Sequence, residues 1–302
     1  MVRSGKKAKP RSRVSIIGAG RLGTALAVAL ASRSYEVQAV VSRQRNHARK
    51  AARLISSRSL ALIADELDQL PPSDLILNAT PDDAIKSVAD KLSRARDQAG
   101  AKGSVLHTSG ALSSEVLKPL AKIGFQIGSM HPLLSVSDPR SGAVALGHAY
   151  YCVEGDAAAL RVARRIVKDL GGKSISIESD KKALYHAAAV MSSGHVTALL
   201  DVAIEMLRHC GVPNMTARRM LLPLLESTWK NLVDADPPRA LTGTFARGDE
   251  ETVRKHLAAL SEPALDDARA AYRLLGKRSL ELMARKGGDA AVIERIKQLL
   301  KG

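Results

Sequence analysis

The chain has 302 residues, of which 45% are hydrophobic and 3% are aromatic, and its formal net charge is +16. This length and composition are typical of a soluble globular protein with two domains and an aliphatic core, and they exclude a disordered or fibrous chain. The two cysteines, Cys152 and Cys210, lie far apart, which excludes a disulfide framework and a zinc site and indicates a reducing compartment. We therefore predict no metal.

Basic residues are concentrated before the first apolar run. Six of them lie there: Arg3, Lys6, Lys7, Lys9, Arg11 and Arg13. They predict a disordered basic tail over residues 1–13, with nucleic-acid contact as the alternative, although no nucleic-acid motif supports it. Arg21 and three glycines interrupt the apolar run that follows, which argues against a secretory signal. Because no segment reaches the roughly 18 apolar residues of a membrane span, we expect a cytoplasmic protein without a membrane segment.

Short apolar runs alternate with helical patterns from Val14 to Glu178. Strands are predicted at residues 14–17, 37–41, 60–63, 74–79, 105–107, 125–130, 148–153 and 174–177, with helices at 22–32, 47–55 and 156–170 among them. This alternation predicts the α/β class, with a doubly wound parallel sheet of the Rossmann type over residues 14–178.

Strand patterns stop after Glu178. Helices are predicted at residues 180–210, 216–235, 251–260, 263–286 and 289–300, separated by glycines and prolines. The sequence therefore predicts an all-helical C-terminal domain over residues 179–302.

The first predicted strand runs directly into a glycine-rich loop, from which a helix leaves. The loop consists of Gly18, Ala19, Gly20, Arg21, Leu22 and Gly23. The first glycine of this motif permits a tight turn, the second lets the backbone approach a pyrophosphate, and the third allows the helix to pack on the strand. The helix N-terminus also attracts phosphates. The loop predicts a dinucleotide-binding site.

The end of the second predicted strand indicates which dinucleotide binds. An NAD site places an acid about 20 residues after the loop, where it holds the ribose hydroxyls. This chain has Ser42, Arg43 and Arg45 there instead, and the nearest acid, Glu36, lies at the start of the strand. Arginines bind a 2′-phosphate that a carboxylate would repel, so we predict NADP as the cofactor. Solvated surface arginines are the alternative.

Polar residues follow several other strands, at the edge where a cofactor cleft is expected. Thr80 and Pro81 are predicted to line that cleft, with an ordinary helix start as the alternative. His107 ends the next strand and is expected beside the cofactor, and Ser109 offers a hydroxyl to an anion. His131 ends a further strand and is a candidate general acid–base group.

The first long helix of the second domain carries another group of candidates. Lys182 and His186 are four residues apart and Ser193 is seven further on, so one uninterrupted helix would bring all three to the same face. We predict that this face meets His131 and Ser109 in one pocket, where burial lowers the pKa of Lys182. A structural role is the alternative for each histidine.

Several segments of the chain resemble a known family. They are VSIIGAGRLGTALA, LNATPDDAI, VLHTSGALSSEVL, GSMHPLLS, KKALYHAAAVMSSG and ALTGTFARGDEETVRKHL, and they span residues 14 to about 260. They are similar to segments of uncharacterised Rossmann-like proteins with a helical C-terminal domain of unknown function. Those proteins are related in architecture to 6-phosphogluconate and 3-hydroxyacid dehydrogenases, pyrroline-5-carboxylate reductase and deazaflavin-dependent NADP reductases. The resemblance implies NAD(P) binding and a helical dimerisation domain, without a settled substrate.

The resemblance also implies roles for single residues. Ser109 matches a Ser-Gly turn that binds the substrate carboxylate in related hydroxyacid dehydrogenases. Lys182 and His186 are placed like the catalytic lysine of those enzymes and its partner one turn later. His131 resembles the histidine that precedes proline in prephenate dehydrogenases, where it contacts the reacting hydroxyl.

The chain departs from the family pattern at two positions. Gly194 stands where an asparagine is expected, and Thr244 stands where a proline is expected. The missing asparagine removes one polar group from the expected substrate site, so the sequence defines neither the substrate nor the direction of the reaction.

The residues and the resemblance together predict an NADP-dependent oxidoreductase of the hydroxyacid dehydrogenase or imine reductase type. It would transfer a hydride to or from a small carboxylate-bearing substrate. Ser109 would hold the carboxylate, Lys182 or His131 would carry the proton, and His186 would orient it. The alternative is a catalytically silent NADP-binding redox sensor or assembly protein. We also expect a homodimer formed mainly by residues 180–302, since a helical domain rich in Ala and Leu must bury its surplus apolar face.

Overall fold

The computed structural model describes residues 12–96 and 102–301. The chain forms two compact units, one ending at Val190 and the other beginning at Met191. The predicted basic tail lies almost wholly outside the described residues, but its last residue does not belong to a tail, because Arg13 is the first residue of a strand.

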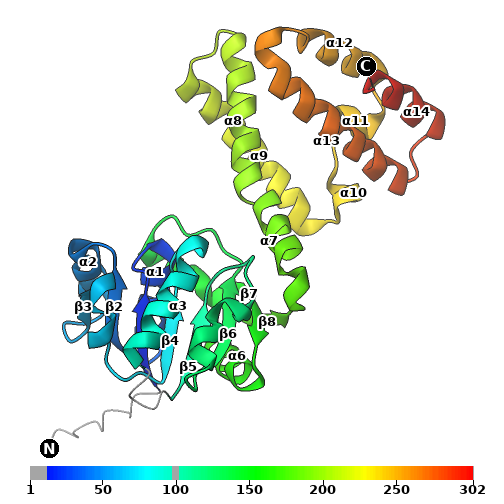
Figure 1. Ribbon diagram of the computed structural model, residues 1–302. Coiled ribbons are helices and arrows are strands. Elements are labelled where there is room, and N and C mark those ends of the chain that lie inside the picture. The colour runs from blue at the N-terminus through cyan, green and yellow to red at the C-terminus, as the bar shows by residue number, and fades with distance from the viewer. Residues whose placement is uncertain (1–11, 97–101, 302) are drawn as a thin grey trace, which may run out of the picture. The chain divides into compact units, whose positions relative to one another are not determined.

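The first unit is built on one eight-stranded sheet in the order β3-β2-β1-β4-β5-β6-β7-β8 (Figure 1). The strands are β1 (Arg13–Ile17), β2 (Glu36–Ser42), β3 (Leu60–Ile63), β4 (Leu75–Asn78), β5 (Ser104–His107), β6 (Gln126–Pro132), β7 (Tyr150–Gly155) and β8 (Lys173–Ser176). The first six are parallel to one another, in the strand order of a Rossmann fold. The predicted α/β class and doubly wound sheet are confirmed.

The last two strands run in the opposite direction, which the sequence did not predict. β7 pairs with β6 antiparallel, and β8 follows β7 in parallel. Between β6 and β7 the chain has only the short helices α5 (Pro139–Ala145) and η4 (Leu146–His148). A parallel connection would have to carry the chain back along the full length of β6, and a strand of seven residues spans about 23 Å. A seven-residue helix is only about 10 Å long, so α5 cannot do this. The chain therefore re-enters the sheet from the edge at which it left.

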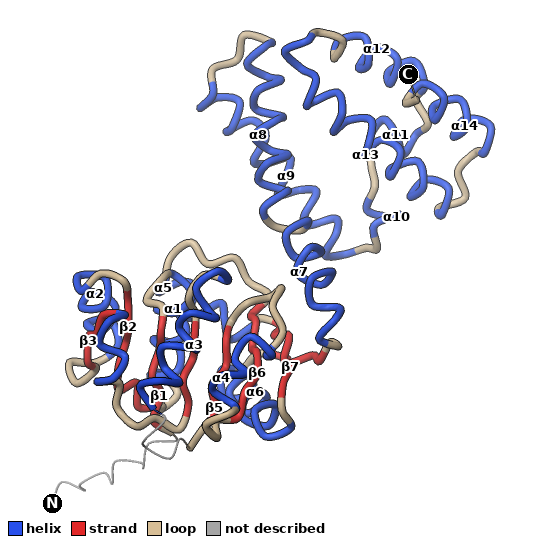
Figure 2. Tube along the Cα trace, viewed as in Figure 1, coloured by secondary structure: helices blue, strands red, loops and turns tan. Residues whose placement is uncertain are grey.

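Helices cover both faces of the sheet, as Figure 2 shows for the blue helices around the red strands. Side chains alternate along β1, so Val14 and Ile16 pack in one core with α1 (Arg21–Ser32) and α6 (Ala157–Leu170). Ile17 packs in a second core on the other face. That face is covered by α3 (Asp82–Arg96), η3 (Ser114–Leu117) and α4 (Lys118–Ala121), while α2 (Arg45–Ile55) and η1 (Ala64–Gln69) flank the β2–β3 edge.

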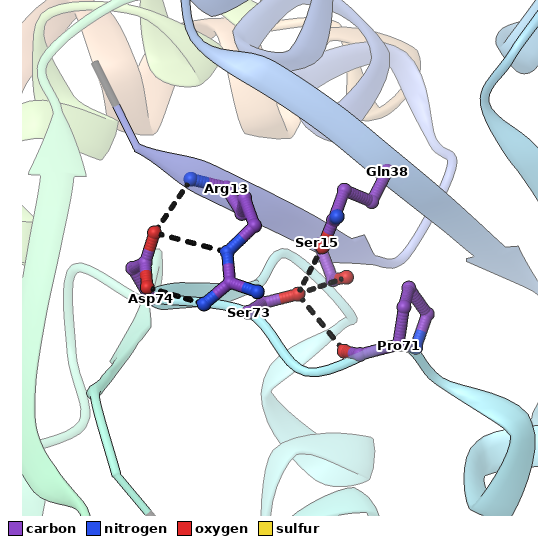
Figure 3. A network of polar contacts seen from close by, with 6 residues as sticks. All are labelled: Arg13, Ser15, Gln38, Pro71, Ser73 and Asp74. Carbon is purple, nitrogen blue, oxygen red and sulfur yellow. Dashed lines mark hydrogen bonds and ion pairs between the residues drawn. The ribbon is translucent and has the colours of Figure 1, made fainter. Parts of the chain in front are cut away.

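A polar network closes the amino-terminal edge of the sheet (Figure 3). Arg13 donates hydrogen bonds to both carboxylate oxygens of Asp74, through its amide at 2.8 Å and its guanidinium at 2.9 Å. Beneath this pair, the buried hydroxyls of Ser15 and Ser73 lie 2.7 Å apart. The guanidinium lowers the pKa of the Asp74 carboxyl below its ordinary value, first through the hydrogen bond. These contacts join the start of β1 to the segment that precedes β4.

The predicted single helix at residues 180–210 is wrong. The chain forms η5 (Ser179–Lys181) and α7 (Lys182–Met191), leaves the helical conformation at Ser193 (φ −131°, ψ −80°), and resumes as α8 (Gly194–His209). Serine and glycine are weak helix formers, which accounts for the break. Ser193 therefore lies outside the helix that carries Lys182 and His186, and it does not share their face.

The second unit is helical, as predicted. Its remaining helices are α9 (Asn214–Asp234), α10 (Pro237–Ala240), α11 (Gly243–Arg247), α12 (Glu250–Ala259), η6 (Pro263–Leu265), α13 (Asp266–Arg285) and α14 (Ala290–Leu299). One small core, which includes Val253, Leu280 and Ile296, joins α12, α13 and α14. The helical run of residues 179–209 is long and apolar enough to cross a membrane by length and composition alone, and its most apolar window is unburied.

Candidate functional site

The glycine loop follows β1 and leads into α1, as the motif requires. Gly18 has φ +105°, and a Cβ there would lie 2.6 Å from the backbone carbonyl carbon of Ala79. A Cβ on Gly23 would lie 2.0 Å from the carbonyl oxygen of Gly18, so only glycine lets α1 pack on the turn. Gly20 is the N-cap residue of α1, is exposed, and would meet nothing within 4 Å. The loop thus combines two tightly packed glycines with one that opens onto space at a helix N-terminus, which fits a pyrophosphate.

The two arginines after β2 are in different environments. Arg45 forms an ion pair with Glu66 and donates a hydrogen bond to the carbonyl oxygen of Ala61 at 3.2 Å. Arg43 is exposed, and it makes no ion pair or hydrogen bond with any residue that the structure describes. Ser42 is half-buried as the last residue of β2. Of these two arginines, Arg43 is therefore the one whose guanidinium has no partner among the described residues.

Thr80 and Pro81 form the turn between β4 and α3. The Thr80 hydroxyl donates to the side-chain oxygen of buried Asn78 at 2.7 Å, and its amide donates to the same oxygen at 3.2 Å. This turn lies directly against the glycine loop, since the backbone of Ala79 and Thr80 is what a Cβ on Gly18 would meet. The turn therefore packs against the glycine loop, at the sheet edge where the cofactor cleft is predicted.

His107 is fully buried, and both of its ring nitrogens are used within the protein. Nδ1 accepts the Ser109 amide at 3.1 Å, and Nε2 lies 3.1 Å from the Ser113 carbonyl oxygen, to which it donates. Burial, together with the charge of Lys182, lowers the pKa of His107 to about 3. His107 thus shapes the turn that follows β5, and neither of its ring nitrogens is free to bind the cofactor beside which it was expected.

The hydroxyl of Ser109 is also fully engaged. It donates to the Asp82 carboxylate at 2.8 Å and accepts the amides of Ala111 at 3.2 Å and Leu112 at 3.0 Å. Ser109 is 5% exposed. A substrate carboxylate would need a free donor at this position, so the structure gives the Ser109 side chain a turn-forming role in place of the expected anion contact.

Lys182 lies at the start of α7 and is completely buried. Its Nζ donates to Ser129 Oγ at 2.7 Å and to the Ser109 carbonyl oxygen at 3.3 Å. Ser129 in turn lies 3.3 Å from the Glu154 carboxylate. Glu154 also accepts the amide and hydroxyl of Ser114, so a carboxylate lies one hydroxyl away from the ammonium. Burial lowers the pKa of Lys182, in the predicted direction.

His131, Tyr185 and His186 form an aromatic cluster beside Lys182. His131 Nδ1 lies 2.9 Å from the Tyr185 hydroxyl, and the His131 ring meets both the Tyr185 and His186 rings edge-on. A Cβ on Gly110 would lie 2.4 Å from His186 Nδ1 and 2.9 Å from the Nε2 and Cε1 atoms of His131. Burial, then the neighbouring His186 and Lys182, lowers the pKa of His131 to about 4.

The sheet brings these groups to the same edge as the glycine loop. β1, β4, β5 and β6 are parallel, so the turns that follow them lie at their common carboxyl edge. In parallel α/β sheets ligands bind outside this edge. Lys182, His131, His186 and the backbone of Ser109 and Gly110 lie close together within the first unit, whereas Ser193, which was predicted to join them, lies outside α7.

Three residues of this cluster were missed in the sequence: Tyr185, Ser129 and Glu154. Ser129 could have been found, because it lies two residues before His131 on β6 and therefore on the same face of the sheet. Tyr185 is three residues after Lys182, which places it on a neighbouring side of the helix. Glu154 had no such signal, since it reaches Ser129 through the unpredicted antiparallel pairing.

Comparison with known families divides the chain near the point where strand direction reverses. Residues 2–132 match the Rossmann-like domain, and residues 149–279 match the domain of unknown function DUF2520. The first match ends with β6, and the second begins just before β7, so β7 and β8 fall within the DUF2520 match. The chain therefore combines a Rossmann-like domain with a DUF2520 domain, and the resemblance inferred from its sequence is confirmed.

Solved structures share this fold over nearly the whole chain. A candidate NADP oxidoreductase from Bacteroides fragilis is 23% identical, with a TM-score of 0.70, covering 89% of this chain and 97% of that one. A protein from Thermotoga maritima is 22% identical, with a TM-score of 0.71 and coverages of 90% and 99%. An imine reductase variant from Myxococcus stipitatus in complex with NAD+ is 18% identical, with a TM-score of 0.56 and coverages of 95% and 99%. No curated protein sequence matches the chain. At these identities the likeness establishes the fold.

Proposed function

We propose that the protein is an NADP(H)-dependent oxidoreductase that transfers a hydride to or from a small carboxylate-bearing substrate with a hydroxyl/ketone or amine/imine centre. The observation that carries the proposal is the position of the His131–Lys182 cluster at the same sheet edge as the glycine loop. A protein that only binds the cofactor would need the glycine loop, but it would not need a buried acid–base cluster at the same edge.

The residues at the loop fit a dinucleotide phosphate. The space beyond Gly20 and the N-terminus of α1 would receive the pyrophosphate, and Arg43 would receive the 2′-phosphate that distinguishes NADP from NAD. When bound, a nicotinamide cofactor supplies or accepts the hydride. The imine reductase with the same fold binds NAD+, so the preference for NADP rests on Arg43 of this chain.

The protein's own groups would manage the proton at the reacting centre. His131 is half-buried, and its Nε2 makes no hydrogen bond with the described residues, so this nitrogen is free to meet a substrate oxygen or nitrogen. Lys182 has no exposed surface, so we assign it to holding the β5 and β6 ends together and to placing a positive charge beneath the site. The proposed substrate carries a carboxylate, but the Ser109 hydroxyl does not bind it, because that hydroxyl is already fully hydrogen-bonded within the protein.

The decisive experiment is an NADPH titration followed by a panel of 2-oxo acids and cyclic imine carboxylates, monitored by NADPH absorbance. We expect NADPH binding and turnover of at least one compound. His131→Gln should keep NADPH affinity within about twofold while turnover is lost, because the defect lies in chemistry. Lys182→Met should also lose turnover, but it removes a buried contact between the β5 and β6 ends as well, so its thermal stability is measured alongside its NADPH affinity. Lys181→Met is the matched control, since Lys181 is exposed and paired with Asp180. NADPH binding without turnover of any compound would favour a silent NADP-binding sensor or assembly protein.

The second unit supports assembly as a homodimer. Large apolar side chains of α9 are exposed in the single chain, among them Leu224 at 63%, Trp229 at 66% and Val233 at 66%. An exposed apolar surface of this kind typically marks an interface. A second copy would also cover the apolar run of residues 179–209, so we propose a cytoplasmic dimer and assign that run no membrane role.

A further inference from the structure

The hydrogen bond between Tyr185 and His131 defines where the proton of the imidazole ring lies. His131 has two ring nitrogens, and in its neutral form only one of them carries a proton. Nδ1 lies 2.9 Å from the Tyr185 hydroxyl. Either the phenol donates to Nδ1, or Nδ1 donates to the phenol oxygen, and the two arrangements leave opposite chemistry at Nε2.

The surroundings of Tyr185 favour the first arrangement. His131 is the only hydrogen-bond partner of the Tyr185 hydroxyl among the described residues. Either arrangement leaves one O–H or N–H without an acceptor among the described residues, so the strength of the shared hydrogen bond decides between them. A phenol O–H is a stronger donor than a neutral imidazole N–H, and a ring nitrogen is a stronger acceptor than a phenol oxygen, so the phenol donates to Nδ1. Burial raises the pKa of Tyr185, so the phenol keeps its proton, and burial lowers the pKa of His131 to about 4, so the ring is neutral near pH 7.

We propose that Tyr185 is a positioning residue that donates its hydroxyl proton to Nδ1 of His131 and thereby places the ring proton on Nε2. The Nε2 edge of the ring lies against Gly110, in the turn at the carboxyl end of β5. Because Nε2 has no partner among the described residues, its N–H is available to a bound molecule.

The consequence concerns the substrate class, and here the inference rests on the proposed function. A neutral Nε2–H is a hydrogen-bond donor and cannot accept. It therefore favours substrates whose reacting atom is an acceptor, namely a ketone oxygen or an unprotonated imine nitrogen. It disfavours a protonated iminium, because the iminium N–H and the ring N–H are both donors. The positive charge of the iminium would also be repelled by Lys182, which belongs to the same cluster.

The chain contains a matched control for this arrangement. In the second unit, His256 Nδ1 lies 2.8 Å from the Tyr272 hydroxyl, and the rings meet edge-on at 89° with 5.6 Å between centroids. The Tyr185–His131 pair has an angle of 88° and the same 5.6 Å. His256 is exposed and belongs to the second unit, so the geometry is shared but the proposed role is not.

The direct test is nuclear magnetic resonance of the full-length protein with nitrogen-15-labelled histidine near pH 7, with His131 assigned from the His131→Gln variant. We expect a protonated Nε2 and an unprotonated Nδ1 in the wild type. We expect a mixture of both tautomers in Tyr185→Phe, which keeps the ring contact and loses only the hydroxyl. A wild-type ring protonated on Nδ1, or a tautomer unchanged by Tyr185→Phe, would overturn the proposal.

Kinetics provide a second readout when the substrate panel yields a compound. Tyr185→Phe should lower kcat about 5- to 10-fold, the effect of losing one hydrogen bond of about 1 kcal/mol, and leave NADPH affinity unchanged. Tyr272→Phe should leave kcat unchanged. Equal kcat in the wild type and Tyr185→Phe would contradict the positioning role. The tautomer measurement needs no substrate, so a failure of the proposed function is distinguished from a failure of this inference.

Discussion

The guanidinium of Arg45 is paired with the carboxylate of Glu66, at the end of β2 where a 2′-phosphate would bind. Glu66 also accepts the amide of Ile63 at 3.1 Å, and the Arg45 guanidinium lowers the pKa of the carboxyl first through its hydrogen bond. Arg45 therefore joins the start of α2 to the chain after β3, while Arg43 has no partner in the part of the chain that the structure describes. Two arginines that are equivalent in the sequence have different tasks in the fold.

Replacing each arginine by alanine should separate these tasks. We expect Arg43→Ala to weaken NADPH binding roughly 10- to 100-fold, because a charged hydrogen bond contributes about 1.5–3 kcal/mol, and to leave NADH binding unchanged. Arg45→Ala should lower the melting temperature and alter the NADPH-to-NADH preference less. Fluorescence titration with both cofactors measures this. Equal affinities of the wild type for NADPH and NADH would contradict the choice of NADP.

The glycines of the loop should respond to alanine in opposite ways. Gly20→Ala adds a methyl group into open space at a φ of −75°, so we expect an unchanged melting temperature and much weaker NADPH binding. Gly23→Ala would place Cβ 2.0 Å from the carbonyl oxygen of Gly18, so we expect marked destabilisation. Thermal unfolding and cofactor titration of both variants distinguish a phosphate-binding loop from a purely structural turn, in which Gly20→Ala would leave binding intact.

The dimer interface can be tested at a single exposed tryptophan. Trp229→Arg should shift the protein towards the monomer, because a charge would be buried where an apolar ring is expected. Light scattering at micromolar concentration measures the mass. Val144→Arg is the control, since Val144 is 72% exposed in the first unit and should leave the mass unchanged. A monomeric wild type would count against the assembly.

The buried histidines should make the fold sensitive to mild acid. His107 has its pKa lowered from 6.5 to about 3, so below about pH 6.5 the unfolded chain binds a proton that the folded chain does not. The free energy of unfolding should therefore fall as pH decreases from about 6.5 towards 3, and His131, with its pKa near 4, acts in the same direction.

Urea unfolding at about pH 7 and about pH 5 measures this dependence. His107→Gln can still donate to the Ser113 carbonyl oxygen but does not titrate, so its stability should fall less between the two conditions. His256→Gln, at an exposed position, should behave like the wild type. An identical loss of stability in His107→Gln would show that this ring does not cause the acid sensitivity.

The sequence carries most of the fold because its strands are short, apolar and clearly separated. The segment Leu60–Ile63 was predicted to the residue. The direction of β7 was not, because it depends on the length of the connection from β6 and not on the residues of the strand itself. The break at Ser193 was missed because the apolar pattern continues through it. The low helix propensity of Ser192, Ser193 and Gly194 was the signal that could have predicted it.

The sequence predicted where the candidate site lies, but it did not predict which hydrogen bonds its residues make. Parallel strands end at one edge, so Ser109 and His131 had to lie near the glycine loop. Whether a polar group is free depends on partners from other elements. The Ser109 hydroxyl donates a hydrogen bond to the Asp82 carboxylate, and the His107 ring donates one to the Ser113 carbonyl oxygen. No local sequence pattern predicts either contact.

Replacing Gly110 by alanine adds a single methyl group, and this change should separate cofactor binding from turnover. A Cβ there would enter the space of the His131 and His186 rings, which must move by several tenths of an ångström or more to accept it. The Gly110→Ala chain would still contain every acid, base and phosphate-binding group, unaltered in charge and in count. If the proposed function holds, this variant would keep NADPH affinity and lose turnover, so that binding and reaction could be studied apart.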